Sequence, residues 1–142
     1  MNSSVLIKLL TYFGSLPFFI AVYLSWSPHT FLGVDGIQWF LTYALVILSF
    51  MAGTLWGQAV NESIQLKSIA LASNAVTLAA WFAFLLVGPT VVLIISALGF
   101  MILYVFEILI MADIKRPDYY LALRLRVTTL VVIAHGLMVF QV

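Results

Sequence analysis

The sequence predicts an all-α integral membrane protein, a single bundle of five transmembrane helices, and three observations lead to this fold class. Of the 142 residues, 65% are hydrophobic and only 8% are charged, whereas soluble domains have about 45–50% apolar and about 25% charged residues. The mean hydropathy is +1.20. Five apolar runs each approach the roughly 20 residues that a helix needs to cross about 30 Å of hydrocarbon. This composition excludes a water-soluble enzyme domain.

The five predicted helices follow one another with short connections. They lie at about 5–25, 37–60, 69–87, 89–111 and 121–141. The first has no small-x-small cleavage signature after Tyr23, so we expect a retained helix and not a signal peptide. Pro17 removes a backbone hydrogen bond inside it, and a kink or a substitute partner is expected near Phe13. Because no connection can hold an extramembrane domain, residues 1–142 are predicted to form one domain.

Glycine and proline indicate how the middle helices are built. Gly88 and Pro89 separate the third run from the fourth, and proline is well tolerated in the first turn of a helix. These two helices should therefore form a tight antiparallel hairpin. In the second run, Ser49, Gly53 and Gly57 recur every four residues, a spacing that lets helix backbones approach closely in lipid. We interpret this stripe as a helix-packing surface, with a ligand groove as the alternative. The sequence leaves open whether the partner helix belongs to this chain or to another one.

The positive charges predict the orientation in the membrane. All six fall on the face where the chain begins: Lys8, Lys67, Lys115, Arg116, Arg124 and Arg126. The positive-inside rule therefore places the N-terminus in the cytoplasm and the C-terminus on the periplasmic side. The outer loop is flanked by Trp26, Trp39 and Phe40, which we expect to form an aromatic belt at the headgroup level. A net charge of +1 without a basic surface cluster argues against binding of nucleic acid.

Glu107 is the clearest polar residue within a predicted span. A charge at the centre of a membrane helix costs about 3 kcal/mol on insertion scales, so it needs a partner or a function. The last two helices are antiparallel about a turn near Lys115 and Arg116, which sets Glu107 level with Arg124 and Arg126. We therefore predict an ion pair between Glu107 and one of these arginines.

Scaling the other helices by depth predicts a polar layer at the level of Glu107. It would also contain Tyr12, Thr54, Trp56, Gln58, Asn74, Tyr104 and Thr128. Arginine offers a forked donor and aromatic rings offer stacking faces, so such a layer suits an anionic lipid headgroup or a quinone ring. Its candidate ligand-binding residues are Glu107, Arg124, Arg126, Asn74, Tyr104 and Trp56. The alternative, which we favour from sequence, is an interfacial salt bridge with snorkelling arginines and scattered hydrogen bonds.

His135 lies deeper, closer to the outer face. The same scaling sets it level with Tyr43, Trp81 and Ser96. We expect a neutral imidazole that shares a hydrogen bond with Ser96 or Tyr43, and a proton relay or ligand contact is the alternative role. One histidine at this level of the bundle and the absence of cysteine predict no metal site.

The chain also lacks the sequence patterns that accompany catalysis. It has no depth-matched Ser-His-Asp set, no paired carboxylates on one helix face, no His-Glu-x-x-His motif and no glycine-rich phosphate loop. We therefore expect neither an enzyme nor a bound cofactor.

Three segments carry a family resemblance. Leu16–Phe18, residues 43–57 and residues 119–128 resemble the domain of unknown function 3429 family, and the strongest part is the stretch Ser-Phe-x-x-Gly-x-x-Trp-Gly. Members include small bacterial inner-membrane proteins and the mitochondrial transmembrane protein 69. The chain departs from the pattern at Ala52, where a second glycine is expected, and at Leu55, where some relatives carry His or Arg. The resemblance implies five helices in a bacterial inner membrane and no known activity.

Two functions remain compatible with these features. The one favoured by the sequence is a non-enzymatic accessory, assembly or scaffold subunit, which associates with itself or with another membrane protein through Ser49, Gly53 and Gly57. The alternative is a protein that binds or transports a lipid, a quinone or a small solute through the polar layer. In both cases the expected partners are membrane lipid and a membrane protein or a second copy of the chain.

Overall fold

The computed structural model describes residues 2–62, 65–109, 112 and 115–142. Within these residues the chain forms five helices: α1 (Ser3–Trp26), α2 (Gly36–Glu62), α3 (Leu66–Leu86), α4 (Pro89–Leu109) and α5 (Tyr120–Val139). Each is long and apolar enough to cross a membrane, so the chain is a multi-pass membrane protein. The described helix ends confirm the predicted bounds to within three residues. The predicted end of the fourth helix, at 111, lies outside the described residues.

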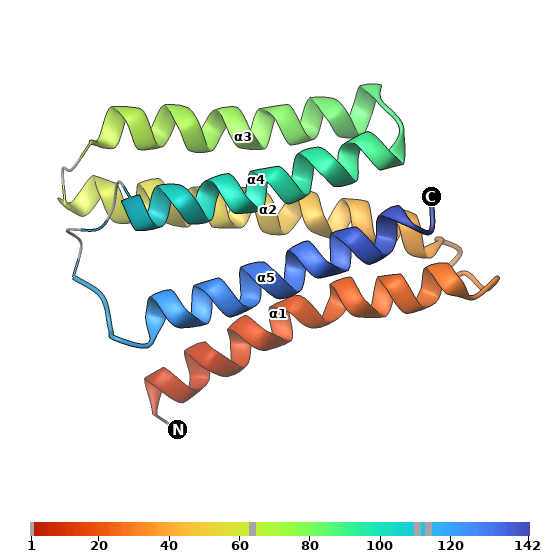
Figure 1. The fold of residues 1–142 in the computed structure, drawn as a ribbon, viewed down its shortest axis with the longest axis horizontal. Helices are drawn as coiled ribbons and strands as arrows, with labels where there is room; N and C mark the ends of the chain where they lie inside the picture. Colours follow the sequence, from red (N-terminus) through yellow and green to blue (C-terminus); the bar gives the residue numbers. More distant parts are fainter. Residues whose placement is uncertain (1, 63–64, 110–111, 113–114) are drawn as a thin grey trace.

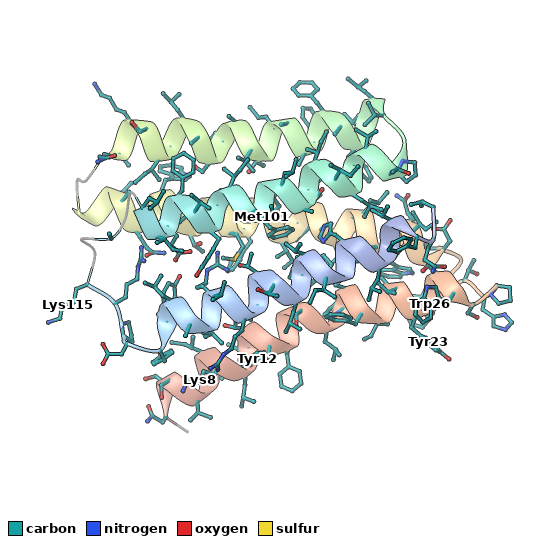
Figure 2. The ribbon with its side chains drawn as sticks, in the orientation of Figure 1. Lys8, Tyr12, Tyr23, Trp26, Met101 and Lys115 are labelled. Carbon is teal, nitrogen blue, oxygen red and sulfur yellow. The ribbon has the colours of Figure 1, made fainter. Side chains whose placement is uncertain are left out.

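The helices pack side by side and alternate in direction, with the two chain ends at opposite ends of the bundle (Figure 1). Helix α2 packs against α1, α3 and α4, and α5 packs against α1 and α4. We call the end where α1 begins and α2 ends the basic end, because the basic side chains lie towards it. Lys8 and Lys115 lie there, whereas Tyr23 and Trp26 lie at the other end (Figure 2). Towards the basic end, α1 and α5 slant away from α2 and α4 (Figure 1).

The hairpin between α3 and α4 has the predicted construction. Only Val87 and Gly88 separate the two helices, and Pro89 is the first residue of α4. The Gly88 carbonyl accepts hydrogen bonds from the backbone N–H groups of Val91 and Val92 at 3.1 and 3.2 Å. The missing N–H of Pro89 therefore leaves no gap in the helix, since the first turn has no partner for it.

Helix α1 continues through Pro17 as one element. The hydroxyl of Tyr43, on α2, donates to the Gly14 carbonyl at 2.8 Å. We expected a substitute hydrogen-bond partner near Phe13, and the Tyr43 hydroxyl takes this role one residue further along, at the Gly14 carbonyl. This bond joins α1 to α2 at the level where the proline weakens the hydrogen-bond ladder of α1.

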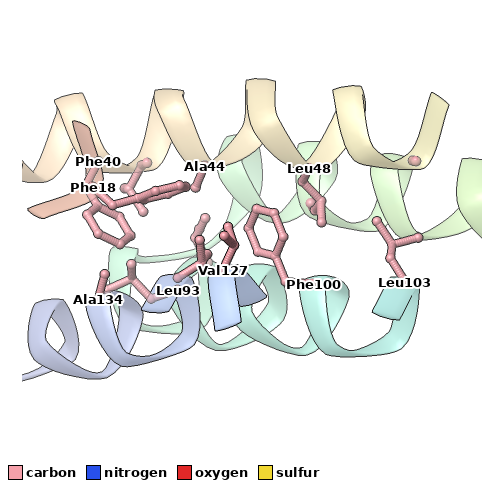
Figure 3. Packing of buried hydrophobic residues seen from close by; sticks show 14 of the residues in the cluster. Phe18, Phe40, Ala44, Leu48, Leu93, Phe100, Leu103, Val127 and Ala134 are labelled. Atoms are coloured by element: carbon pink, nitrogen blue, oxygen red, sulfur yellow. The ribbon is translucent and has the colours of Figure 1, made fainter. Parts of the chain in front are cut away.

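An aromatic cluster fills the centre of the bundle (Figure 3). Phe18 has no exposed surface, and its ring meets those of Phe40 at 5.1 Å and Tyr43 at 4.9 Å between centroids, edge to face. The prediction that Phe40 belongs to an aromatic belt is wrong, because Phe40 is completely buried in this cluster. Trp26 is 59% exposed at the end opposite the basic end, as a belt residue requires.

Gly99, and not a glycine of the predicted stripe, lies at a close contact between helices. A Cβ on Gly99 of α4 would lie 3.1 Å from the Val76 side chain and 3.2 Å from that of Leu48, so α4 packs tightly there against α2 and α3. A Cβ on Gly53 or Gly57 would meet nothing within 4 Å in the described part of the chain. The stripe therefore faces outwards and is not an internal helix contact.

Candidate functional site

Glu107 on α4 and Arg124 on α5 form the predicted ion pair. Arg124 Nε lies 3.0 Å from Glu107 Oε2, and the two side chains are 9% and 1% exposed. The pair joins α4 to α5 near the basic end. Arg126 is exposed and lies about 200° around α5 from Arg124, so the prediction that it shares this cluster is wrong.

A second arginine lies against the pair. Arg116 Nη1 donates to the Glu107 carbonyl at 3.4 Å, and its guanidinium lies 5.5 Å from the ring centroid of Tyr120. Arg116 Nε and Nη2 and Glu107 Oε1 are enclosed without a hydrogen-bond partner among the described residues. The cluster therefore has two guanidiniums and one carboxylate. Donors of Arg116 and one acceptor of Glu107 remain without a hydrogen bond to a described residue.

A groove of about 490 Å³ opens beside this cluster, between α1, α2 and α5. Its lining residues are Ile7, Leu10, Thr11, Gly14, Ser15, Phe18, Ile47, Phe50, Met51, Thr54, Gln58, Tyr120, Arg124, Val127 and Val131. The volume falls within the roughly 300–1,000 Å³ of small-molecule sites. Leu10 and Phe50 on its walls are 61% and 65% exposed, so the groove is open at the side of the bundle.

Polar side chains gather at one end of this mostly apolar groove. Thr54 and Gln58 lie one helical turn apart on α2, and Tyr120 and Arg124 lie one turn apart on α5. Both pairs lie towards the basic end. The far end is lined by Phe18 and Val131, which are both buried. The groove is therefore amphipathic along its length, with an apolar interior and a polar end.

The contacts of Arg124 leave part of its guanidinium unused. Nε holds Glu107, and Nη1 lies 3.9 Å from the sulfur of Met51, a weak acceptor. Nη2 has no hydrogen bond to any described residue. Because Arg124 is only 7% exposed and lines the groove, this donor is available to a molecule within the groove.

Besides Arg126, three of the predicted ligand-binding residues belong neither to the groove nor to the charged cluster beside it. Asn74 is exposed on α3, and its side-chain amide donates to the Ala70 carbonyl at 2.7 Å. Trp56 is 41% exposed and lies about 200° around α2 from Gln58. Tyr104 is half-buried on α4 but does not line the groove. Their depth was predicted, but the direction in which each side chain points from its helix was not.

Sequence reasoning missed three contributors to the site. Met51 and Tyr120 line the groove, and Arg116 lies on the Tyr120 ring. The spacing of Met51, Thr54 and Gln58, three and then four residues, is the helical-face signal that could have placed them on one wall.

The predicted hydrogen bond of His135 is wrong. Its Nδ1 lies 2.7 Å from the Val131 carbonyl of the same helix, and the Tyr43 hydroxyl donates instead to Gly14. A carbonyl only accepts, so Nδ1 carries the proton. The ring packs against Phe18, Phe40 and Phe100 at 4.8–5.6 Å between centroids. Nε2 is buried without a partner among the described residues, and His135 belongs to the aromatic core and not to the groove.

A second cavity, of about 330 Å³, lies towards the other end of the bundle. It is lined by Pro17, Ile20, Ala21, Leu24, Phe31, Trp39 and Tyr43. None of these side chains carries a charge. Of the two cavities, only the groove near the basic end therefore combines an apolar wall with a charged group.

Comparisons with known proteins identify the family of the chain. Neither the curated proteins nor the solved structures gave a match. One family model, described as "Protein of unknown function (DUF3429)", matches residues 4–140. This match covers nearly the whole chain and all five helices, so the chain belongs to the DUF3429 family.

Proposed function

We propose that this chain is a non-enzymatic protein of a bacterial inner membrane that binds one amphipathic membrane molecule, a lipid or a quinone, in the groove between α1, α2 and α5. The observation that carries the proposal is the buried Arg124 at one end of an apolar groove that is open at the side of the bundle. The molecule enters from the bilayer, places its chain along the apolar wall and its polar group beside Arg124.

The position of the polar end supports this arrangement. Six Lys and Arg residues towards the basic end predict that it faces the cytoplasm. Arg124 is the fifth residue of α5, about 6 Å from the start of that helix. The headgroup layer on each side of the hydrocarbon is roughly 5–7 Å thick. The polar end of the groove would therefore lie where the headgroup of a cytoplasmic-leaflet lipid meets its chains.

Selectivity in this groove must come from its polar end. Helix surfaces and lipid tails are equally apolar, so apolar contact alone does not distinguish one chain from another. An empty groove would lose dispersion contacts along its walls, and any chain restores them. Arg124, Gln58 and Tyr120 are the groups that can retain one molecule against exchange with bulk lipid.

Filling the groove should remove the bound molecule. Gly14 lines the groove, and a Cβ there would meet nothing within 4 Å, so the side chain of Gly14→Trp can extend into the groove. We expect the wild-type protein to retain about one lipid-like molecule in native mass spectrometry from a mild detergent, and Gly14→Trp to lose most of it.

Gly136→Trp is the matched control. Gly136 is exposed on α5, lies outside the groove and has equally open space around its Cβ position. This variant should retain the molecule as the wild type does. Equal loss from both variants, or no retained molecule in the wild type, would count against the proposal.

A second function, lateral association as an accessory or scaffold subunit, is favoured by one observation. Gly53 and Gly57 lie on the outward side of α2, with nothing in the described part of the chain within 4 Å of their Cβ positions. Ser49 lies one turn before them. Another helix, from a second copy or another membrane protein, could approach this surface closely.

Gly53→Ile should separate such a complex into monomers by holding the two backbones apart. The expected readout is a fall in the mass of the purified complex in a gentle detergent. Asp35→Asn, in the outer loop, should leave the complex intact, because an asparagine oxygen can still accept the Gln38 N–H at the start of α2. A wild-type monomer that carries no partner would remove this second function.

A further inference from the structure

We infer that the polar group bound at the end of the groove is anionic, and that the ligand is a phospholipid of the surrounding membrane with a net negative headgroup. This inference rests on the proposed function and adds the chemical class of the ligand. It excludes a neutral quinone ring as the preferred occupant.

The first step is the unused donor of Arg124. The Arg124 side chain is 9% exposed, and its Nη2 has no hydrogen bond to a described residue. A guanidinium N–H that lines a mostly apolar groove needs an acceptor from water or from a bound molecule. A guanidinium prefers a charged oxygen, because charge-assisted hydrogen bonds are shorter and stronger than neutral ones. A phosphate oxygen in the groove would meet this preference.

The second step is the charge of the cluster. Among the described residues, Glu107 is the one carboxylate beside the two guanidiniums, so the described part of the cluster carries one excess positive charge. Arg116 Nε and Nη2 are enclosed without partners in that part of the chain. An uncompensated buried charge is strongly unfavourable. A bound anion close by would compensate it, whereas a neutral ring would not.

The third step is the wider charge balance at the basic end. Lys8 Nζ lies 4.7 Å from the ring centroid of Tyr119, next to the Tyr120 that lines the groove. The sequence has six Lys and Arg there, against at most four acids, because Asp35 lies in the outer loop. Basic residues near the membrane surface attract anionic lipids of the cytoplasmic leaflet. Both the local cluster and its surroundings therefore favour a negative headgroup.

The experiment compares lipids that share their acyl chains and differ in their headgroup. The full-length protein in mild detergent is titrated with phosphatidylglycerol, which is anionic, and with phosphatidylcholine, which has no net charge, and the bound fraction is read by native mass spectrometry. We expect phosphatidylglycerol to bind roughly tenfold more tightly. Both lipids offer a phosphate to Arg124, but the positive choline group of phosphatidylcholine is repelled by the excess positive charge of the cluster.

Two variants test whether the Arg124 cluster produces this preference. Glu107→Gln removes the carboxylate that competes for Arg124, so the preference for phosphatidylglycerol should increase, and this lipid should raise the thermal midpoint of the variant more than that of the wild type. Glu107→Gln combined with Arg124→Gln removes both charges of the ion pair together, so the remaining guanidinium is that of Arg116, which does not line the groove. This double variant should still bind lipid, but it should bind phosphatidylglycerol and phosphatidylcholine about equally.

Arg126→Gln is the matched control, since it removes one positive charge from the same helix on the side away from Arg124. It should leave the tenfold preference unchanged. Inorganic phosphate, tested as a competitor at the same concentration as the lipid, should displace none of it, because free phosphate gains nothing from the apolar wall.

The possible results separate the inference from the proposed function. Equal binding of the two lipids by the wild type, or an unchanged preference in the double variant, would overturn the anionic headgroup and leave a lipid-binding groove. Displacement by phosphate would overturn the lipid as the source of the anion. If neither lipid binds to the wild type more than it binds to Gly14→Trp, the proposed function itself is overturned.

Discussion

Arg124→Gln is expected to destabilise the bundle by about 3 kcal/mol, the cost of removing one partner of a buried ion pair. The variant leaves the Glu107 carboxylate, which is 1% exposed, without the guanidinium that pairs with it. The free energy of unfolding, measured by titration from a mild detergent into a denaturing one, gives this loss directly.

The double variant Glu107→Gln with Arg124→Gln should be more stable than the sum of the two single changes predicts. Coupling between polar groups on membrane helices averages about 0.6 kcal/mol and reaches about 1.7, and a buried pair at 3.0 Å should lie near the upper value. Arg126→Gln, exposed on the same helix, should change stability by less than about 0.5 kcal/mol. Strict additivity of the two single changes would mean that Glu107 is held by other groups.

Phe18→Ala is expected to have the second largest effect, a loss of about 2 kcal/mol. Phe18 has no exposed surface and contacts the rings of Phe40, Tyr43 and His135. In soluble proteins such a truncation costs about 3–5 kcal/mol. We expect less here, because the unfolded reference state remains in lipid and the loss is one of packing and not of transfer from water.

Phe13→Ala provides the comparison on the same helix. Phe13 is 61% exposed, so its ring exchanges one apolar neighbour for another in the bilayer. Its truncation should change the unfolding free energy by less than about 0.5 kcal/mol. If Phe18→Ala and Phe13→Ala lower the free energy of unfolding by similar amounts, the aromatic cluster is not the packed centre of the bundle.

The sequence was sufficient to predict the helices and the depth of the charges. The length of an apolar run is fixed by the thickness of the hydrocarbon, so five runs predicted five helices with small errors at their ends. Antiparallel geometry relates residue numbers on adjacent helices, and this predicted the pairing of Glu107 with Arg124. Both inferences concern the position of a residue along the membrane normal, and this position can be read from where the apolar runs begin and end.

The direction of each side chain around its helix could not be predicted in the same way. The helices of a membrane protein are apolar on all sides, so hydropathy does not indicate which face is internal. For this reason Trp56 and Asn74 were assigned to a layer that they do not face, while Met51 and Tyr120 were missed. The same limit applies to glycine, because Gly99 makes a close helix contact and Gly53 does not.

The central claim is that a membrane molecule occupies the groove between α1, α2 and α5. Val131 tests it most directly, because this residue is 3% exposed and lines the end of the groove away from the basic end. In lipid nanodiscs, nuclear Overhauser contacts should connect the Val131 methyl groups to lipid acyl protons, and Gly14→Trp should abolish them. Contacts confined to outward residues such as Leu71, which is 73% exposed, with none at Val131, would contradict the account.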